Sequence, residues 1–333
     1  MSMAMKRAAR AVAALGSAAV LAACNADAKK TEKYLAGGAS REDAMVAAAT
    51  VGDTAAVKAF IKQGLSPDSR SSADLTPLMS AAGARENDTV KFLLDNGAGP
   101  NVARASGATA VHSAAEIGNA AALRALLDKG ANPRVVTAGG FTPLMAAAKS
   151  GDLESVELLL SKGSDVTARN KDGWAALHAA VESKKPEVVL ALLGAGADPN
   201  VATKNGWTPL MEASKQGQLP VVQALLAKGA RPDAATTDGW TVLMAAVEAG
   251  KADAVRELLA KGANPNARTS TGWTAVMGAA AKGQGDAVQA LMAAGADARA
   301  TDKDGTSALT YAQKAGHAQV VDMLRTGGAP RAR

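Results

Sequence analysis

The sequence predicts an all-α repeat solenoid of about nine repeat units including caps, each a pair of antiparallel helices with a hairpin-like loop. The main observation is a 33-residue period, in which Thr76-Pro77-Leu78 returns as Thr142-Pro143-Leu144 and as Thr208-Pro209-Leu210. Glycine follows the same period in two further registers, one of which is interrupted only at Arg85 and Lys184. The composition agrees with this fold, because 48% of the residues are hydrophobic but only 3% are aromatic, and slim side chains let helices pack closely.

The chain begins with the layout of a secretory signal over residues 1–23. Three basic residues precede an apolar run over 11–23, which is too short to cross ~30 Å of hydrocarbon as a helix. The run ends in Leu21-Ala22-Ala23-Cys24, which resembles the lipobox of bacterial lipoproteins. This resemblance implies cleavage before the cysteine and its acylation, with palmitate as a typical chain. Because Asn25 rather than Asp follows, it also implies the periplasmic face of the outer membrane.

Residues 24–39 are predicted to be the lipidated cysteine and a flexible tether, because they are small, polar and contain glycine. The repeat domain is predicted over residues 40–333. Its first helix is expected to open at Ser40-Arg41-Glu42-Asp43, which has the pattern of a capping box.

Within each repeat unit the residue types predict two helices and their ends. Thr142 is expected to cap a first helix through its hydroxyl, and Pro143 fits the first helical position because no hydrogen bond is lost there. Gly151 permits the tight turn between the helices, and a Val-x-x-Leu-Leu pattern over 156–160 forms the apolar face of the second helix. Gly163 supplies the left-handed residue that ends it.

These repeat units resemble ankyrin repeats. The motif Thr-Pro-Leu-x-x-Ala-Ala, the glycine between helices and the ending Leu-Leu-x-x-Gly-Ala-Asp/Asn-Pro-Asn occur with variations over residues 41–333. The resemblance implies helix pairs stacked at ~10 Å per unit in a solenoid about 90 Å long, with polar caps over 40–66 and 306–333. It also implies a protein partner, bound on the concave face.

The charge pattern disfavours nucleic acid as a partner. The net charge is +6, from 37 Lys and Arg against 31 Asp and Glu. Without the three basic residues of the predicted signal, the count is 34 against 31, and the remaining signs are interspersed. We expect instead that a protein is the partner. We also expect a monomer that reaches the membrane through its lipid anchor.

A register of methionine and histidine raises a metal-handling hypothesis. Three residues after each Thr position stand Met79, His112, Met145, His178, Met211, Met244 and Met277. Equivalent positions in neighbouring units should lie ~10 Å apart, whereas bonds to a shared metal are only ~2.0–2.3 Å, so flexible core filling is the favoured interpretation. The i,i+4 pairs His112–Glu116 and His178–Glu182 lack an accompanying nucleophile or phosphate loop. The sequence thus predicts no catalytic residue, no metal site, no cofactor and no enzyme activity.

Two registers are candidate partner-binding positions. The first directly precedes the Thr position and holds Phe141, Trp174, Trp207, Trp240 and Trp273. In ankyrin repeats this position lies at the hairpin base, facing the concave side, and tryptophan is common in binding hot spots. The polar hairpin tips before the rings, such as Thr203 and Thr236, suit hydrogen bonding beside them. The alternative is that each ring only packs on the next hairpin.

The second register, seven residues after each Thr position, alternates in sign: Glu116, Lys149, Glu182, Lys215, Glu248 and then Ala281 with Lys282 beside it. One interpretation is a self-neutralising ladder in which each exposed pair contributes ~0–1 kcal/mol. The other is that Lys149, Glu182, Lys215 and Glu248 form a pattern that sets the register of a bound partner.

These observations favour a non-enzymatic, lipid-anchored periplasmic scaffold that binds a partner protein on the concave face of repeat units four to eight. Accessory, protective and immunity roles fit equally well. Two alternatives stay open, namely a metal- or redox-handling periplasmic protein that uses Met and His, and a structural envelope spacer.

Overall fold

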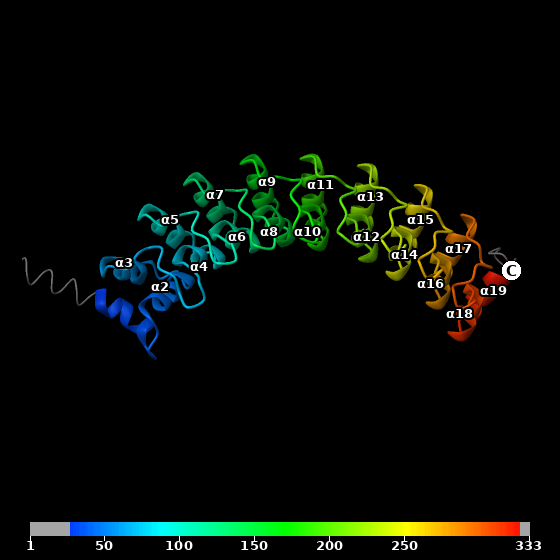
Figure 1. Ribbon diagram of the computed structural model, residues 1–333, viewed down its shortest axis with the longest axis horizontal. Coiled ribbons are helices and arrows are strands. Elements are labelled where there is room, and N and C mark those ends of the chain that lie inside the picture. Colours follow the sequence, from blue (N-terminus) through cyan, green and yellow to red (C-terminus); the bar gives the residue numbers. More distant parts are fainter. Residues whose placement is uncertain (1–26, 327–333) are drawn as a thin grey trace, which may run out of the picture. The chain divides into compact units, whose positions relative to one another are not determined.

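The computed structural model describes residues 27–326, and these form two compact units. The first unit comprises 27–138 with 161–163, and the second comprises 139–160 with 164–326. Each unit is a stack of helix pairs (Figure 1). In this part of the chain no helix has the length and apolarity needed to cross a membrane. The predicted signal over 1–23 and the predicted acylation site Cys24 lie outside the described residues.

Nine helix pairs follow one another across the described residues, which confirms the predicted all-α repeat solenoid. The first compact unit contains α2 (Arg41–Thr50), α3 (Thr54–Lys62), α4 (Pro77–Gly83), α5 (Asn87–Asp95), α6 (Ala110–Glu116) and α7 (Ala120–Asp128). The next helices are α8 (Pro143–Ser150), α9 (Leu153–Ser161), α10 (Ala176–Glu182), α11 (Pro186–Gly194), α12 (Pro209–Lys215) and α13 (Leu219–Ala227). The last are α14 (Val242–Glu248), α15 (Ala252–Ala260), α16 (Ala275–Ala281), α17 (Gly285–Ala293), α18 (Ala308–Lys314) and α19 (Ala318–Arg325).

The first helix of a pair begins as the sequence predicts. At α12 the Thr208 hydroxyl accepts a hydrogen bond from the Met211 amide at 3.2 Å, and Pro209 occupies the first turn. The same cap opens α4, α8, α14 and α16. Each cap satisfies an amide that the helix itself leaves unpaired, so the threonine fixes where the first helix of these repeats starts.

The core of each repeat is made of small and aliphatic side chains. Ala213 of α12 and Leu225 of α13 are fully buried, and the methionines of the predicted register, Met79, Met145, Met211, Met244 and Met277, are buried as well. The methionines therefore lie in the core, as the core-filling interpretation predicts.

The hairpin tips of the second unit are joined by a ladder of backbone hydrogen bonds. The amides of Lys204, Thr237 and Ser270 donate to the carbonyls of Asp172, Asn205 and Asp238 at 2.8, 3.0 and 2.7 Å. At Gly239 a Cβ atom would stand 2.8 Å from the Arg268 carbonyl oxygen, so glycine is needed for this close approach. The ladder sets the spacing of the aromatic residues that follow each tip.

The segment predicted to be a flexible tether over 24–39 differs from the structure, because residues 27–35 form a helix. This helix (blue in Figure 1) packs beside α3: Thr31 is only 2% exposed, and the Tyr34 hydroxyl donates to Asp53 at 3.0 Å. Its Ala, Lys, Glu and Leu residues favour a helix, and the helix ends before Gly37 and Gly38, which have positive φ.

Candidate protein-binding surface

Each tryptophan of the predicted register is held by its own hairpin tip. The Trp240 amide donates to the Thr236 hydroxyl at 3.0 Å, and the Thr236 amide donates to the Trp240 carbonyl at 2.9 Å. Thr203 and Trp207 repeat both bonds with the same distances. The sequence suggested that these tip hydroxyls were available to a partner, but the structure uses them to fix the base of each ring.

Trp174 and Trp273 each pack against a neighbouring aromatic side chain. Trp174 stacks on His178 with ring centroids 4.7 Å apart and an interplanar angle of 26°. Trp273 meets Tyr311 edge to face at 4.8 Å, while Phe141 is 48% exposed. Trp174 and Trp273 therefore pack against side chains of α10 and α18 rather than on the next hairpin, and all four tryptophans remain only half-buried.

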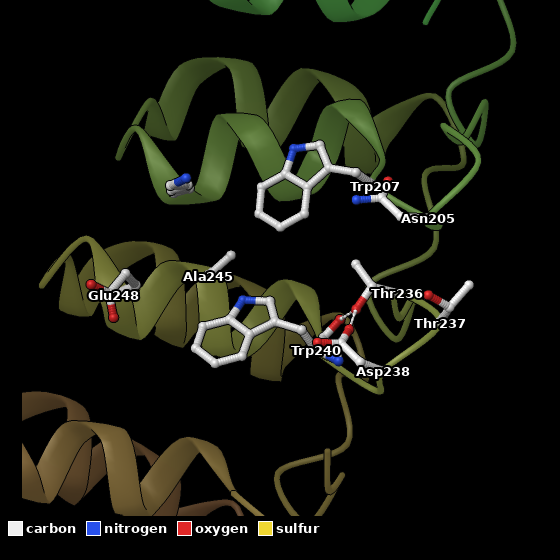
Figure 2. Close-up of a pocket in the computed structure, with 9 residues that line it drawn as sticks. Asn205, Trp207, Thr236, Thr237, Asp238, Trp240, Ala245 and Glu248 are labelled. Carbon is white, nitrogen blue, oxygen red and sulfur yellow. Dashed lines mark hydrogen bonds between the residues drawn. The ribbon is translucent and has the colours of Figure 1, made fainter. Parts of the chain in front are cut away.

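Trp207 and Trp240 bound a cavity of about 550 Å³. It lies between the sixth repeat, which contains α12 and α13, and the seventh, which contains α14 and α15. Figure 2 shows the two indoles one above the other, each lying along the helix that follows it, with Thr236, Thr237 and Asp238 at the hairpin end. The complete lining is Asn205, Trp207, Lys215, Thr236, Thr237, Asp238, Trp240, Ala245 and Glu248. The cavity thus has two aromatic walls, a polar end at the hairpins and a charged end at the helix C-termini.

A second cavity of about 230 Å³ continues this surface into the eighth repeat. It is lined by Trp240, Met244, Val247, Glu248, Trp273, Ala275, Gly278, Ala281 and Lys282. Trp240 and Glu248 line both cavities. We call the two together the aromatic groove, which runs over α12, α14 and α16 within one compact unit.

The charged register pairs only in part. Lys149 lies 3.9 Å from Glu182, and Glu248 pairs with Lys282 at 2.7 Å. Lys215 instead places its ammonium 5.4 Å from the centroid of the Trp207 ring, and among the described residues it has no carboxylate at ion-pair distance. In place of a continuous ladder of charges, the register therefore forms two ion pairs, and between them Lys215 contacts the Trp207 ring.

Sequence reasoning missed Glu212, whose carboxylate accepts a hydrogen bond from the Trp207 indole at 2.8 Å. No register could have found it, because the equivalent positions in the next two repeats are Ala245 and Gly278. Tyr311 was missed for a similar reason, since it lies in the last repeat outside the aromatic register.

Both ring nitrogens of His178 face backbone groups, so neither is left for an acid–base pair with Glu182. Its Nδ1 accepts from the Ala175 amide at 3.2 Å, and its Nε2 faces the Trp207 carbonyl. Burial lowers the pKa of His178 from 6.5 to about 4, against the opposing effect of the Trp207 carbonyl. Within residues 27–326, no group of three or more His, Cys, Asp or Glu side chains is placed to hold a metal.

Comparison with known families identifies a matching family model. The family described as "Ankyrin repeats (3 copies)" matches residues 8–104, 84–170, 140–203, 177–269 and 263–330. These ranges overlap and cover nearly the whole chain. No curated protein matches the sequence.

Proposed function

We propose that this chain, which belongs to the ankyrin repeat family, is a non-enzymatic scaffold that binds a partner protein along its aromatic groove. Ankyrin repeats are generally protein-interaction scaffolds and typically lack catalysis. The observation that carries the proposal is the pair Trp207 and Trp240, whose half-buried indoles wall a cavity of about 550 Å³.

The groove is suited to binding because it is already ordered. The tip threonines and the backbone ladder hold the rings in place, so little conformational entropy is lost when a partner docks. Indole rings also offer a large apolar area with few rotatable bonds.

The proposal includes the cellular setting that the N-terminus implies. Residues 1–23 act as a lipoprotein signal, Cys24 carries the acyl chains, and the protein faces the periplasm from the outer membrane. An accessory, protective or immunity role follows from a scaffold that is held at the envelope and carries out no chemistry of its own.

A capture experiment tests the binding surface. The mature chain is used as bait in cross-linked envelope extracts, and captured proteins are identified by mass spectrometry. Trp207→Ala/Trp240→Ala should remove the specific partner, because truncating such anchors typically costs about 2 kcal/mol or more each. Leu190→Ala is the matched control, since Leu190 is 49% exposed on α11 away from the groove. Unchanged capture by the tryptophan double variant would contradict the proposal.

A further inference from the structure

The indole N–H of Trp240 is an unused donor at the centre of the aromatic groove. In the sixth repeat the equivalent N–H, on Trp207, donates to Glu212 five residues later. In the seventh repeat the residue five positions after Trp240 is Ala245, which has no acceptor. No acceptor for the Trp240 indole is found among residues 27–326, and its nitrogen lies on the ring edge nearer to Trp207 (Figure 2).

Lys215 is the one cation lining the same cavity, and no described carboxylate neutralises it directly. Glu212, three residues earlier, already accepts hydrogen bonds from the Trp207 indole and the Gln216 amide. Glu248, the acidic residue at the same end of the cavity, is neutralised by Lys282 at 2.7 Å. At the helix end of the cavity, Lys215 therefore has no ion-pair partner among the described residues, whereas both nearby carboxylates already have partners.

The hairpin end has the opposite character. Asp238 is the remaining charged residue in the lining, and its carboxylate accepts the Thr236 hydroxyl. A ligand with an acidic group would therefore place it at Lys215, at the far end of the indoles from Asp238. The charges thus favour a ligand with an acidic group and also set the orientation of that ligand in the cavity.

We propose that this cavity takes an extended segment of the partner protein in which an acidic side chain stands next to an apolar or aromatic one. The carboxylate pairs with Lys215, a carbonyl of the segment accepts from the Trp240 indole, and the apolar side chain lies against the two rings. This proposal rests on the proposed function and deepens it by naming the chemistry of the partner.

Selection from a random library of 12-residue peptides displayed on phage tests this chemistry. The full mature chain should enrich peptides with Asp or Glu within two positions of an apolar or aromatic residue. Lys215→Glu should instead enrich Lys or Arg at that place, and should bind the peptides selected on the original protein about tenfold more weakly. Lys228→Glu makes the same charge change at the exposed C-cap of α13 in the same repeat, outside the cavity. It should leave the selection unchanged.

Three results would overturn the proposal: no enriched peptide, enrichment without an acidic residue, or an acidic preference that Lys215→Glu leaves intact. Far-ultraviolet circular dichroism establishes that each variant is folded. Trp240→Phe provides a second readout, because it keeps a ring but removes the donor, and the selected peptides should then bind several-fold more weakly. If the tryptophan double variant still loses its partner but peptides show no acidic preference, this inference fails while the proposed function stands.

Discussion

The Nε2 atom of His178 lies 3.1 Å from the carbonyl oxygen of Trp207 and joins the fifth repeat to the sixth. Because Nδ1 of the same ring accepts from the Ala175 amide, the proton of the neutral imidazole resides on Nε2 and is donated to Trp207. The ring also stacks on Trp174. One buried side chain thus supports two of the aromatic residues proposed to face the partner.

The burial of His178 predicts a loss of stability in acid. Burial lowers the pKa of His178 from 6.5 to about 4, so between these values the unfolded chain binds a proton that the folded chain does not. The free energy of unfolding should be unaffected by this group above pH 6.5 and fall by up to about 3 kcal/mol as the pH drops to 4. Urea unfolding of the original protein and of His178→Gln across this range measures the effect. Parallel pH profiles would contradict it.

A gain of stability is predicted at Lys184, where the glycine register is interrupted. Lys184 and Arg85 have φ of 60° and 66°, the left-handed conformation that glycines adopt at the equivalent positions. A side chain strains this conformation, although glycine also makes the unfolded chain more flexible. Lys184→Gly should therefore raise the free energy of unfolding by about 0.5–1 kcal/mol. The opposite change, Gly217→Lys at φ 67°, serves as the control and should lower it.

Asn200 links successive repeats through both ends of its amide. Its Nδ2 donates to the Gly229 carbonyl at 2.9 Å and its Oδ1 accepts from the Arg231 amide at 2.8 Å. Asn200→Ala should lower the free energy of unfolding by about 1 kcal/mol, measured by urea denaturation.

The repeat offers a reciprocal change at Asp233, which occupies the same register position one repeat later. A carboxylate cannot donate a hydrogen bond. Asp233→Asn should therefore create the counterpart of the bond from Asn200 Nδ2 to the Gly229 carbonyl, and should stabilise the protein by about 0.5–1 kcal/mol. The exposed contact from Arg231 to Asp233, at 3.6 Å, contributes little to oppose this. A destabilised Asp233→Asn protein would show that the bridge depends on more than the amide.

Most of the fold could be predicted because the same local patterns of residues recur from repeat to repeat. Thr208 caps a helix through its hydroxyl as the sequence predicts, and the period fixes where the next helix begins. Where the glycine register is interrupted, the backbone conformation is still kept, since Lys184 is left-handed like the glycines at the equivalent positions. The helix over 27–35 was missed because it lies outside the period, where only helix propensity indicated it.

The candidate site was predicted less completely, because it depends on departures from the period. The register located Trp207 and Trp240, which the structure places on one cavity. It could not show that Glu212 occupies one indole N–H while Ala245 leaves the next without an acceptor. Nor could alternating signs show that Glu248 pairs with Lys282, because partner choice depends on side-chain geometry.

The proposed lipid anchor predicts a simple biochemical result. Cys24→Ser removes the only thiol that could be acylated, so the protein should move from the detergent phase to the aqueous phase on Triton X-114 partitioning. Because acyl chains contribute about 0.8 kcal/mol per buried methylene group, the shift should be nearly complete. A Cys24→Ser protein that stays in the detergent phase would contradict the anchor.

The helix over 27–35 predicts that the segment after Cys24 contributes to stability, which a flexible tether would not. The Asp53 carboxylate accepts from the Tyr34 hydroxyl at 3.0 Å, pairs with Lys33 at 2.8 Å, and caps α3 through the Ala56 amide at 2.9 Å. Deleting residues 27–35 should therefore lower the thermal midpoint of unfolding, and Tyr34→Phe should cost about 1 kcal/mol. Lys33→Ala should have a small effect, since the lysine is largely exposed. An unchanged midpoint after the deletion would mean that this helix adds nothing to the first repeat.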